Sequence, residues 1–258
     1  IILNEITKGK GMDKALYISM SGAKQSMLAQ QAHSNNLANV NTTGFKNDFA
    51  QARSMPVYGE HHPTRAYAMT ERPGTNFQQG PLNETGRELD VAIKGEGWIA
   101  VQAPDGSEAY TRAGDLQTDS NGILRTGSGL AVLGNGGPIA IPPSAKMEVG
   151  ADGTISVIPL GQPADAIAEI DRIKLVNPGN DQIEKGLDGL VRVKEGNPPA
   201  VVDGNVRLEP GFLEGSNVNA VESLTEILSL ARQYELHVKV MSTADQNSEA
   251  AARLLQIS

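Results

Sequence analysis

Residues 220–255 read AVESLTEILSLARQYELHVKVMSTADQNSEAAARLL, and apolar or small side chains recur along them at alternating steps of four and three. The positions in this repeat are Ala220, Leu224, Ile227, Ala231, Tyr234, Val238, Met241, Asp245, Ser248, Ala252 and Leu255. Such spacing is the heptad pattern of a helix that packs lengthwise on another helix. The alanines in the repeat also favour close helix–helix packing. We expect a long helix, capped by Ser216 or Asn217 because their side-chain oxygens can accept first-turn amide hydrogens.

A second, less regular repeat lies near the other end of the chain. Its positions are Leu16, Met20, Ala23, Met27, Gln30, Ser34 and Leu37. Residues 34–46 then read SNNLANVNTTGFK, in which the asparagines compete with helical backbone bonds and Gly44 suits a positive φ past a helix end. We expect the helix to end near residues 38–40 and Asn36, Asn39, Asn41 and Gly44 to set the following turn.

The middle of the chain is patterned differently. All 14 prolines lie from Pro56 to Pro210, so helices are expected only at the two ends. Between them, short β-branched runs alternate with the turn dipeptides Asp105-Gly106, Asn121-Gly122 and Asp152-Gly153. The candidate strands are residues 89–93, 98–102, 109–112, 123–125, 131–133, 139–141, 155–158, 170–176 and 190–193.

These patterns predict an α+β fold, in which discontinuous terminal helices flank a mainly antiparallel β domain. We expect a helical domain formed by residues 12–46 together with 211–258, an extended arm over residues 47–87, and a β domain over residues 88–210. Residues 1–11 differ in character from the helical pattern after them, and Met12 reads as the natural start. We interpret that segment as extraneous and leave it out of the fold.

Composition limits the possible functions. A net charge of −8 without a basic block argues against nucleic acid or an anionic membrane surface as the main partner. The lack of cysteine excludes disulfides, cysteine-ligated zinc and thiol catalysis. No run approaches the roughly 20 apolar residues of a membrane-spanning helix.

Candidate chemical sites are weak. His61-His62 has no third ligand in register, and the Asp-Gly pairs lack the ligand spacing of a calcium loop, so we predict no metal or cofactor. Trp98 lies in an apolar run and is expected in the core. Sequence alone leaves a pair of glycosidase carboxylates open, but no recognisable catalytic motif is present and we do not expect an enzyme.

The terminal helices have two possible partners: the chain's own β domain, or other helices, including those of neighbouring subunits. The long heptad repeat favours the second, and we expect the helices to order fully on assembly. The residues predicted to form the assembly interface are Leu16, Met20, Met27, Leu37, Leu224, Ile227, Tyr234, Val238, Met241 and Leu255.

The two ends resemble a known protein family. Matching segments are SGA at residues 21–23, NNLANVNTTGFK at 35–46, LEGSNVN at 213–219 and RQYE at 232–235; in the middle, LDVAI at 89–93, GWIAV at 97–101 and YTR at 110–112 also match. By these motifs the chain is similar to the flagellar axial proteins of bacteria, the rod and hook proteins.

The resemblance implies a structural subunit of the basal-body rod that spans the periplasm and transmits torque. Its implied partners are other rod proteins, copies of itself and the flagellar export apparatus, with no nucleic acid and no membrane insertion. The opening MDKA and Trp98 are most like the proximal-rod members. Distal-rod or hook members are the alternative, and a secreted glycan-binding or glycan-cleaving β protein is a distant one.

Overall fold

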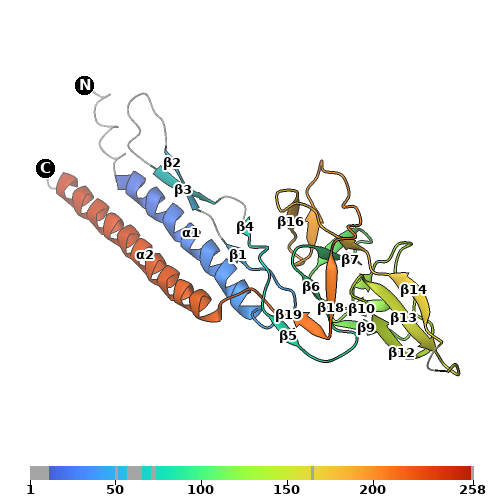
Figure 1. Ribbon diagram of the computed structural model, residues 1–258. Helices are drawn as coiled ribbons and strands as arrows, with labels where there is room; N and C mark the ends of the chain where they lie inside the picture. Colours follow the sequence, from blue (N-terminus) through green and yellow to red (C-terminus); the bar gives the residue numbers. More distant parts are fainter. Residues whose placement is uncertain (1–11, 50–51, 57–65, 71–73, 164–165, 257–258) are drawn as a thin grey trace. The chain divides into compact units, whose positions relative to one another are not determined.

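The computed structural model describes residues 12–49, 52–56, 66–70, 74–163 and 166–256. They divide into two compact units (Figure 1). The helical unit comprises the described residues of Ile1–Ala38, Asp48–Gly74 and Asn219–Ser258. The β unit comprises Asn39–Asn47 and the described residues of Thr75–Val218. Terminal helices flank a mainly antiparallel β structure along the chain, which confirms the predicted α+β class.

The helical unit is built on two long helices. α1 (Met12–Ala38) and α2 (Ala220–Gln256) lie side by side and run in opposite directions (Figure 1). The hairpin of β2 (Ala52–Pro56) and β3 (Ala66–Thr70) is antiparallel, and β3 contacts α1. β1 (Asp48–Phe49) pairs with β4 (Gly74–Thr75). The helices of one chain therefore supply each other with a partner.

The β unit centres on an eight-stranded sheet with the order β16-β17-β8-β7-β11-β10-β9, in which β15 also pairs with β7. In chain order its strands are β7 (Trp98–Gln102), β8 (Glu108–Thr111), β9 (Leu116–Thr118), β10 (Leu124–Thr126), β11 (Ala131–Val132), β15 (Leu175–Val176), β16 (Ile183–Lys185) and β17 (Val191–Val193).

Three smaller sheets complete the unit. β12 (Ser144–Val149), β13 (Thr154–Pro159) and β14 (Ala168–Arg172) form an antiparallel meander. β6 (Val91–Lys94) pairs with β18 (Arg207–Pro210), and β5 (Leu82–Glu84) pairs with β19 (Phe212–Glu214).

The apolar run of β7 explains the core. Side chains alternate across a strand, so Ile99 and Val101 join one buried cluster while Trp98 and Ala100 join another. The ring of Phe77 meets Trp98 edge to face, with centroids 5.5 Å apart. The strand is buried on both faces, which is why it reads as continuous apolar sequence.

The predicted turns are confirmed, whereas several strand predictions need correction. Gly106, Gly122 and Gly153 have φ of 84°, 79° and 87° and close the three expected hairpins. Of residues 139–141, only Ala140 makes a bridge, to Ile123, because the amides of Ile139 and Ile141 bond to separate partners, Val132 and Gly122, and not to one strand. Residues 170–176 form two strands, β14 and β15. Between them the Ile173 amide bonds to the Gly153 carbonyl, and the chain changes sheet.

Sequence patterns did not indicate β12, β16, β18 or β19, because all four are partly exposed and carry charged residues, and the last three are also short. The predictions made for residues 1–11 and for His61-His62 lie outside the described residues. Among the described residues, no helix is both long enough and apolar enough to span a bilayer.

Candidate assembly surface and buried junction cluster

The face that α1 turns inward is made of small and polar residues. Ser19, Ala23, Ser26 and Asn36 are buried, whereas Met20 and Met27 are 53% and 55% exposed. The Ser26 hydroxyl donates to the carbonyl of Gly22, four residues earlier, at 3.1 Å. This bond satisfies a buried hydroxyl without a partner helix. The small residues bring the two helices close together while adding little apolar area to their contact.

The two helices approach each other closely at Gly22. A Cβ added to Gly22 would lie 2.4 Å from the Cε1 atom of His237, far inside contact distance. The imidazole of α2 therefore lies directly on the backbone of α1. Only glycine at position 22 leaves room for the ring.

The inward face of α2 follows steps of four and three. Its least exposed members are the buried Ser223 and the half-buried Ile227, Leu230, Tyr234, His237, Met241 and Ala244. The predicted repeat shares Ile227, Tyr234 and Met241 with this face. Its alternate members Leu224 and Val238 are shifted by one residue, and they are 50% and 40% exposed.

Large apolar side chains remain on the outside of both helices, and we call them the exposed flanks. They are Tyr17, Ile18, Met20, Met27 and Leu28 of α1, and Val221, Leu224, Leu228, Leu236, Val238, Val240 and Leu254 of α2. Of the remaining predicted interface residues, Leu16 and Leu37 are half-buried. The side chain of Leu255 lies outside those described.

The cap of α2 differs from the prediction. The Oδ1 atom of Asn219 accepts from the amides of Val221 and Glu222 at 3.1 and 3.3 Å, so Asn219 is the N-cap. The side-chain oxygens of Ser216 and Asn217 accept from amides that lie before the first turn of α2. The Ser216 hydroxyl accepts from the Val218 amide, and Asn217 Oδ1 accepts from the Asn47 amide.

The predicted turn residues occupy the end of α1 and the segment beyond it. The Asn36 side chain bonds to both backbone groups of Asp48, donating to its carbonyl at 2.6 Å and accepting from its amide at 2.9 Å. The Asn39 carbonyl accepts from the Thr42 amide at 3.1 Å, whereas Asn41 is exposed.

Gly44 has the predicted positive φ, at 67°. A Cβ there would lie 2.3 Å from the backbone carbon of Arg112. Both the left-handed backbone and the close packing require glycine at this position.

A buried ionic cluster lies within the β unit. Glu214, at the end of β19, has a fully buried side chain, and its carboxylate contacts Lys46 Nζ at 2.6 Å and Arg112 Nη1 at 2.9 Å. The amide of Gly80 donates to the same carboxylate at 3.0 Å. We call Lys46, Arg112 and Glu214 the junction cluster.

Further contacts hold the two cations in place. Lys46 Nζ also donates to the Gln78 carbonyl at 2.6 Å. Arg112 Nη2 donates to the Gly95 carbonyl at 2.9 Å, and its guanidinium lies 5.2 Å from the centre of the Trp98 ring. Burial lowers the pKa of Lys46 below its ordinary value, while the neighbouring Glu214 carboxylate acts in the opposite direction.

All three cluster residues lie in segments that match the family, yet sequence reasoning assigned no role to any of them. Lys46 and Glu214 are 168 positions apart, and local patterns carry no information about such a pairing. The available signal was a charged residue beside apolar or glycine neighbours, in Gly44-Phe45-Lys46 and in Leu213-Glu214-Gly215.

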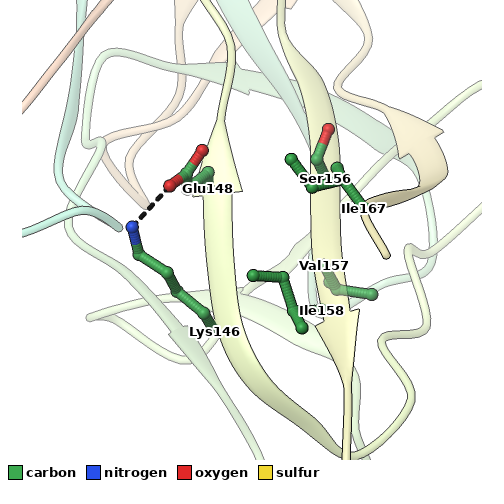
Figure 2. A pocket seen from close by; sticks show the side chains of 6 residues that line it. All are labelled: Lys146, Glu148, Ser156, Val157, Ile158 and Ile167. Atoms are coloured by element: carbon green, nitrogen blue, oxygen red, sulfur yellow. Dashed lines mark hydrogen bonds and ion pairs between the residues drawn. The ribbon is translucent and has the colours of Figure 1, made fainter. Parts of the chain in front are cut away.

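A surface depression on the β12–β14 meander is too small for a ligand. Figure 2 shows its lining, in which Lys146 pairs with Glu148 beside Ser156, Val157, Ile158 and Ile167. Its volume of about 10 Å³ matches a single water molecule. In the described part of the chain, no group of three or more acidic, histidine or cysteine side chains is arranged to hold a metal.

Family models match three parts of the chain. Residues 16–46 match the model described as flagella basal body rod protein, and residues 92–157 match the D1 domain of flagellar hook protein FlgE/F/G. Residues 209–254 match the C-terminal model of the flagellar basal body rod FlgEFG proteins. The matches include Lys46, Arg112 and Glu214.

Whole-chain relatives agree with these models. The flagellar basal-body rod protein FlgF of Escherichia coli (strain K12) is 40% identical, with 96% of this chain and 100% of the relative covered. The FlgF of Caulobacter vibrioides is 35% identical over 95% of this chain and 100% of its own. The rod protein FlgG of Buchnera aphidicola subsp. Schizaphis graminum is 33% identical over 94% of this chain and 100% of its own.

Proposed function

This chain belongs to the flagellar basal-body rod protein family, as a structural subunit located in the basal body, and we propose that it joins its neighbours through the exposed flanks of α1 and α2. The observation that supports this proposal is that the apolar side chains of the two helices lie partly outside the contact between them. On α1, small residues fill the contact within the chain, while Met20 and Met27 stay outside it. On α2, Leu224, Leu228 and Val238 stay outside although Ile227, Leu230 and Met241 face inward. Exposed apolar side chains gathered on two helices are typical of a surface that a partner covers.

The energetics support this choice. Each large aliphatic side chain that becomes fully buried contributes roughly 1.5–3 kcal/mol, so the flanks offer more stabilisation than the small-residue face of α1 that is already in contact. Helices with apolar residues on several sides are typical of positions inside a helical wall. Heterologous contacts of one subunit with the next generate a helical array, the geometry of a rod.

The partners that we propose are other rod proteins and further copies of this chain, and the export apparatus during delivery. We also propose that the chain has no catalytic activity and serves to carry torque. A place in the proximal rod is supported by the identity to relatives named FlgF. The relatives named FlgG, at 33% identity and below, favour a distal-rod place as the second candidate.

The test is a charge placed on an exposed flank. Leu224→Asp should leave the monomer folded, because the side chain is already half exposed, but should prevent incorporation into basal bodies and abolish swimming. Ser229→Asp adds the same charge to another exposed position of α2 and should be incorporated normally. Basal bodies are isolated from cells that express each variant and are probed for the chain. Normal incorporation of Leu224→Asp would contradict the proposal.

A further inference from the structure

The chain passes between the two units at four points, after residues 38, 47, 74 and 218. On the β-unit side, these passages involve three segments: residues 39–47, 75–81 and 214–218. Force that travels along the covalent chain from one unit to the other must enter the β unit through these segments. The structure joins all three within the β unit.

Backbone bonds join the first segment to the last. The Gly44 amide donates to the Glu214 carbonyl at 2.8 Å, and the Asn217 amide donates to the Phe45 carbonyl at 3.3 Å. The Asn47 amide donates to the side chain of Asn217 at 2.7 Å. Two segments about 170 residues apart are thus held in register.

The middle segment bonds to both of the others. The Asn76 amide donates to the Asn47 carbonyl at 2.9 Å. The Asn217 side-chain amide donates to the carbonyls of Asn76 and Gln78 at 2.8 and 3.1 Å. The Gly215 amide donates to the Pro81 carbonyl at 2.8 Å.

The junction cluster lies at the centre of these bonds. Lys46 comes from the first segment and Glu214 from the last, and Glu214 also accepts from Gly80 in the middle one. Arg112, directly after β8, ties the same carboxylate to the body of the β unit. Charge-assisted hydrogen bonds of this kind are shorter and stronger than neutral ones.

We propose that Lys46, Arg112 and Glu214 are positioning residues that clamp the three segments together, so that load passing between the units is shared among them. The inference rests on the proposed function as a torque-carrying rod subunit. A set of apolar residues of the same volume would stabilise a core as well or better. What the ions add is a fixed register between chain segments, which is useful where a junction is pulled or twisted.

The first experiment is hydrogen exchange on the full-length protein. Glu214→Gln should speed exchange in peptides covering 39–48, 75–81 and 211–218 together, by about tenfold or more, because local opening becomes easier. Peptides from β7 and β8 should keep wild-type rates. The control is Glu209→Gln, which removes a partly exposed carboxylate on the preceding strand. Faster exchange around residue 214 alone, or equally across the β unit, would overturn the clamp.

A double variant separates clamping from stability. Lys46→Met with Glu214→Gln removes one positive and one negative charge, so the net charge of the cluster is kept. We expect its unfolding midpoint to recover toward wild type relative to Glu214→Gln, because the single variant leaves two buried cations without a counter-ion. Exchange in the three segments should stay fast. If slow exchange in the three segments recovers together with the unfolding midpoint, the three residues only stabilise the core and do not act as a clamp.

The last experiment puts the double variant into the rod. We expect it in isolated basal bodies at wild-type amounts, with a swimming speed that falls more steeply with medium viscosity than that of cells carrying the wild-type chain or Glu209→Gln. Wild-type speed at every viscosity would refute the clamp, as would loss of the variant from basal bodies that accept the wild-type chain. If the wild-type chain itself is missing from basal bodies, the proposed function is wrong. The hydrogen-exchange experiment still tests whether the cluster clamps the three segments.

Discussion

The β unit buries its large aliphatic side chains completely, whereas the helical unit buries serine, alanine and asparagine and leaves methionine and leucine half exposed. Ile99, Val101 and Leu116 have no exposed surface, while Met20, Met27 and Leu224 keep half or more of theirs. Since burial of apolar area is the main favourable term in folding, the first unit is complete by itself. The second leaves apolar surface exposed, which the assembly that we propose would bury against the helices of neighbouring subunits.

The largest effect should follow from a cavity in the β unit. Ile99→Ala should lower the free energy of unfolding of this unit by about 2–5 kcal/mol. Trp98, the sole tryptophan, lies in the same unit and reports its unfolding by fluorescence during denaturant titration. Met20→Ala should change the helical unfolding followed by circular dichroism by no more than about 0.5 kcal/mol in the monomer. Equal losses of unfolding free energy in the two variants would contradict the difference in apolar burial between the units.

A glycine pair tests how tightly the β unit holds the segment after α1. Gly44→Ala should cost about 2–4 kcal/mol, because a strained positive φ is combined with an added methyl group against the Arg112 backbone. Gly106→Ala also has a positive φ but open space around it, and should cost only about 1–2 kcal/mol. Both are measured through Trp98 fluorescence. A larger loss at Gly106 would contradict the packing seen at Gly44.

A substitution at Gly22 tests how the close contact with His237 stabilises the helix pair. Gly22→Ala should destabilise the pair by about 1–3 kcal/mol, because the new Cβ meets the His237 imidazole. In a His237→Ala background the same change should cost at least about 1 kcal/mol less. Thermal melting followed by circular dichroism at 222 nm measures both. Equal costs in the two backgrounds would mean that the ring does not limit the approach.

The smallest effect is expected at the start of α2. Asn219→Ala should cost about 1 kcal/mol, because two first-turn amides lose their acceptor. Ser216→Ala should cost less, since its hydroxyl accepts only from the Val218 amide, before the helix. The two variants are compared by helical melting. The reverse order would restore Ser216 as the cap.

Local patterns predicted the elements that local chemistry determines. The α+β class, the end of α1 near Ala38 and the Asp-Gly and Asn-Gly hairpins all follow from periodicity and from glycine's access to positive φ. The cap was misplaced because three residues with suitable oxygens, Ser216, Asn217 and Asn219, lie close together in the chain. Only the tertiary bonds reveal which of them is free to cap.

The phase of the helix repeat shows a further limit of prediction from sequence. Sequence reasoning predicted Met20, Met27, Leu224 and Val238 for the assembly interface and did not separate that interface from the contact within one chain. Within one chain, the small residues Ser19, Gly22, Ala23 and Ser26 form the inward face of α1. The junction cluster was missed for a different reason, because its members pair over 102 and 168 residues.

The pairing of the first helix with the last also determines the order in which parts of the chain can fold. A chain that emerges from a ribosome or a narrow channel, whichever end leads, releases one of α1 and α2 long before the other, with the whole β unit in between. Contacts of such sequence separation form late, since closing the intervening loop costs entropy. Until then the leading helix has neither its intramolecular partner nor a neighbour, and the β unit can finish folding first.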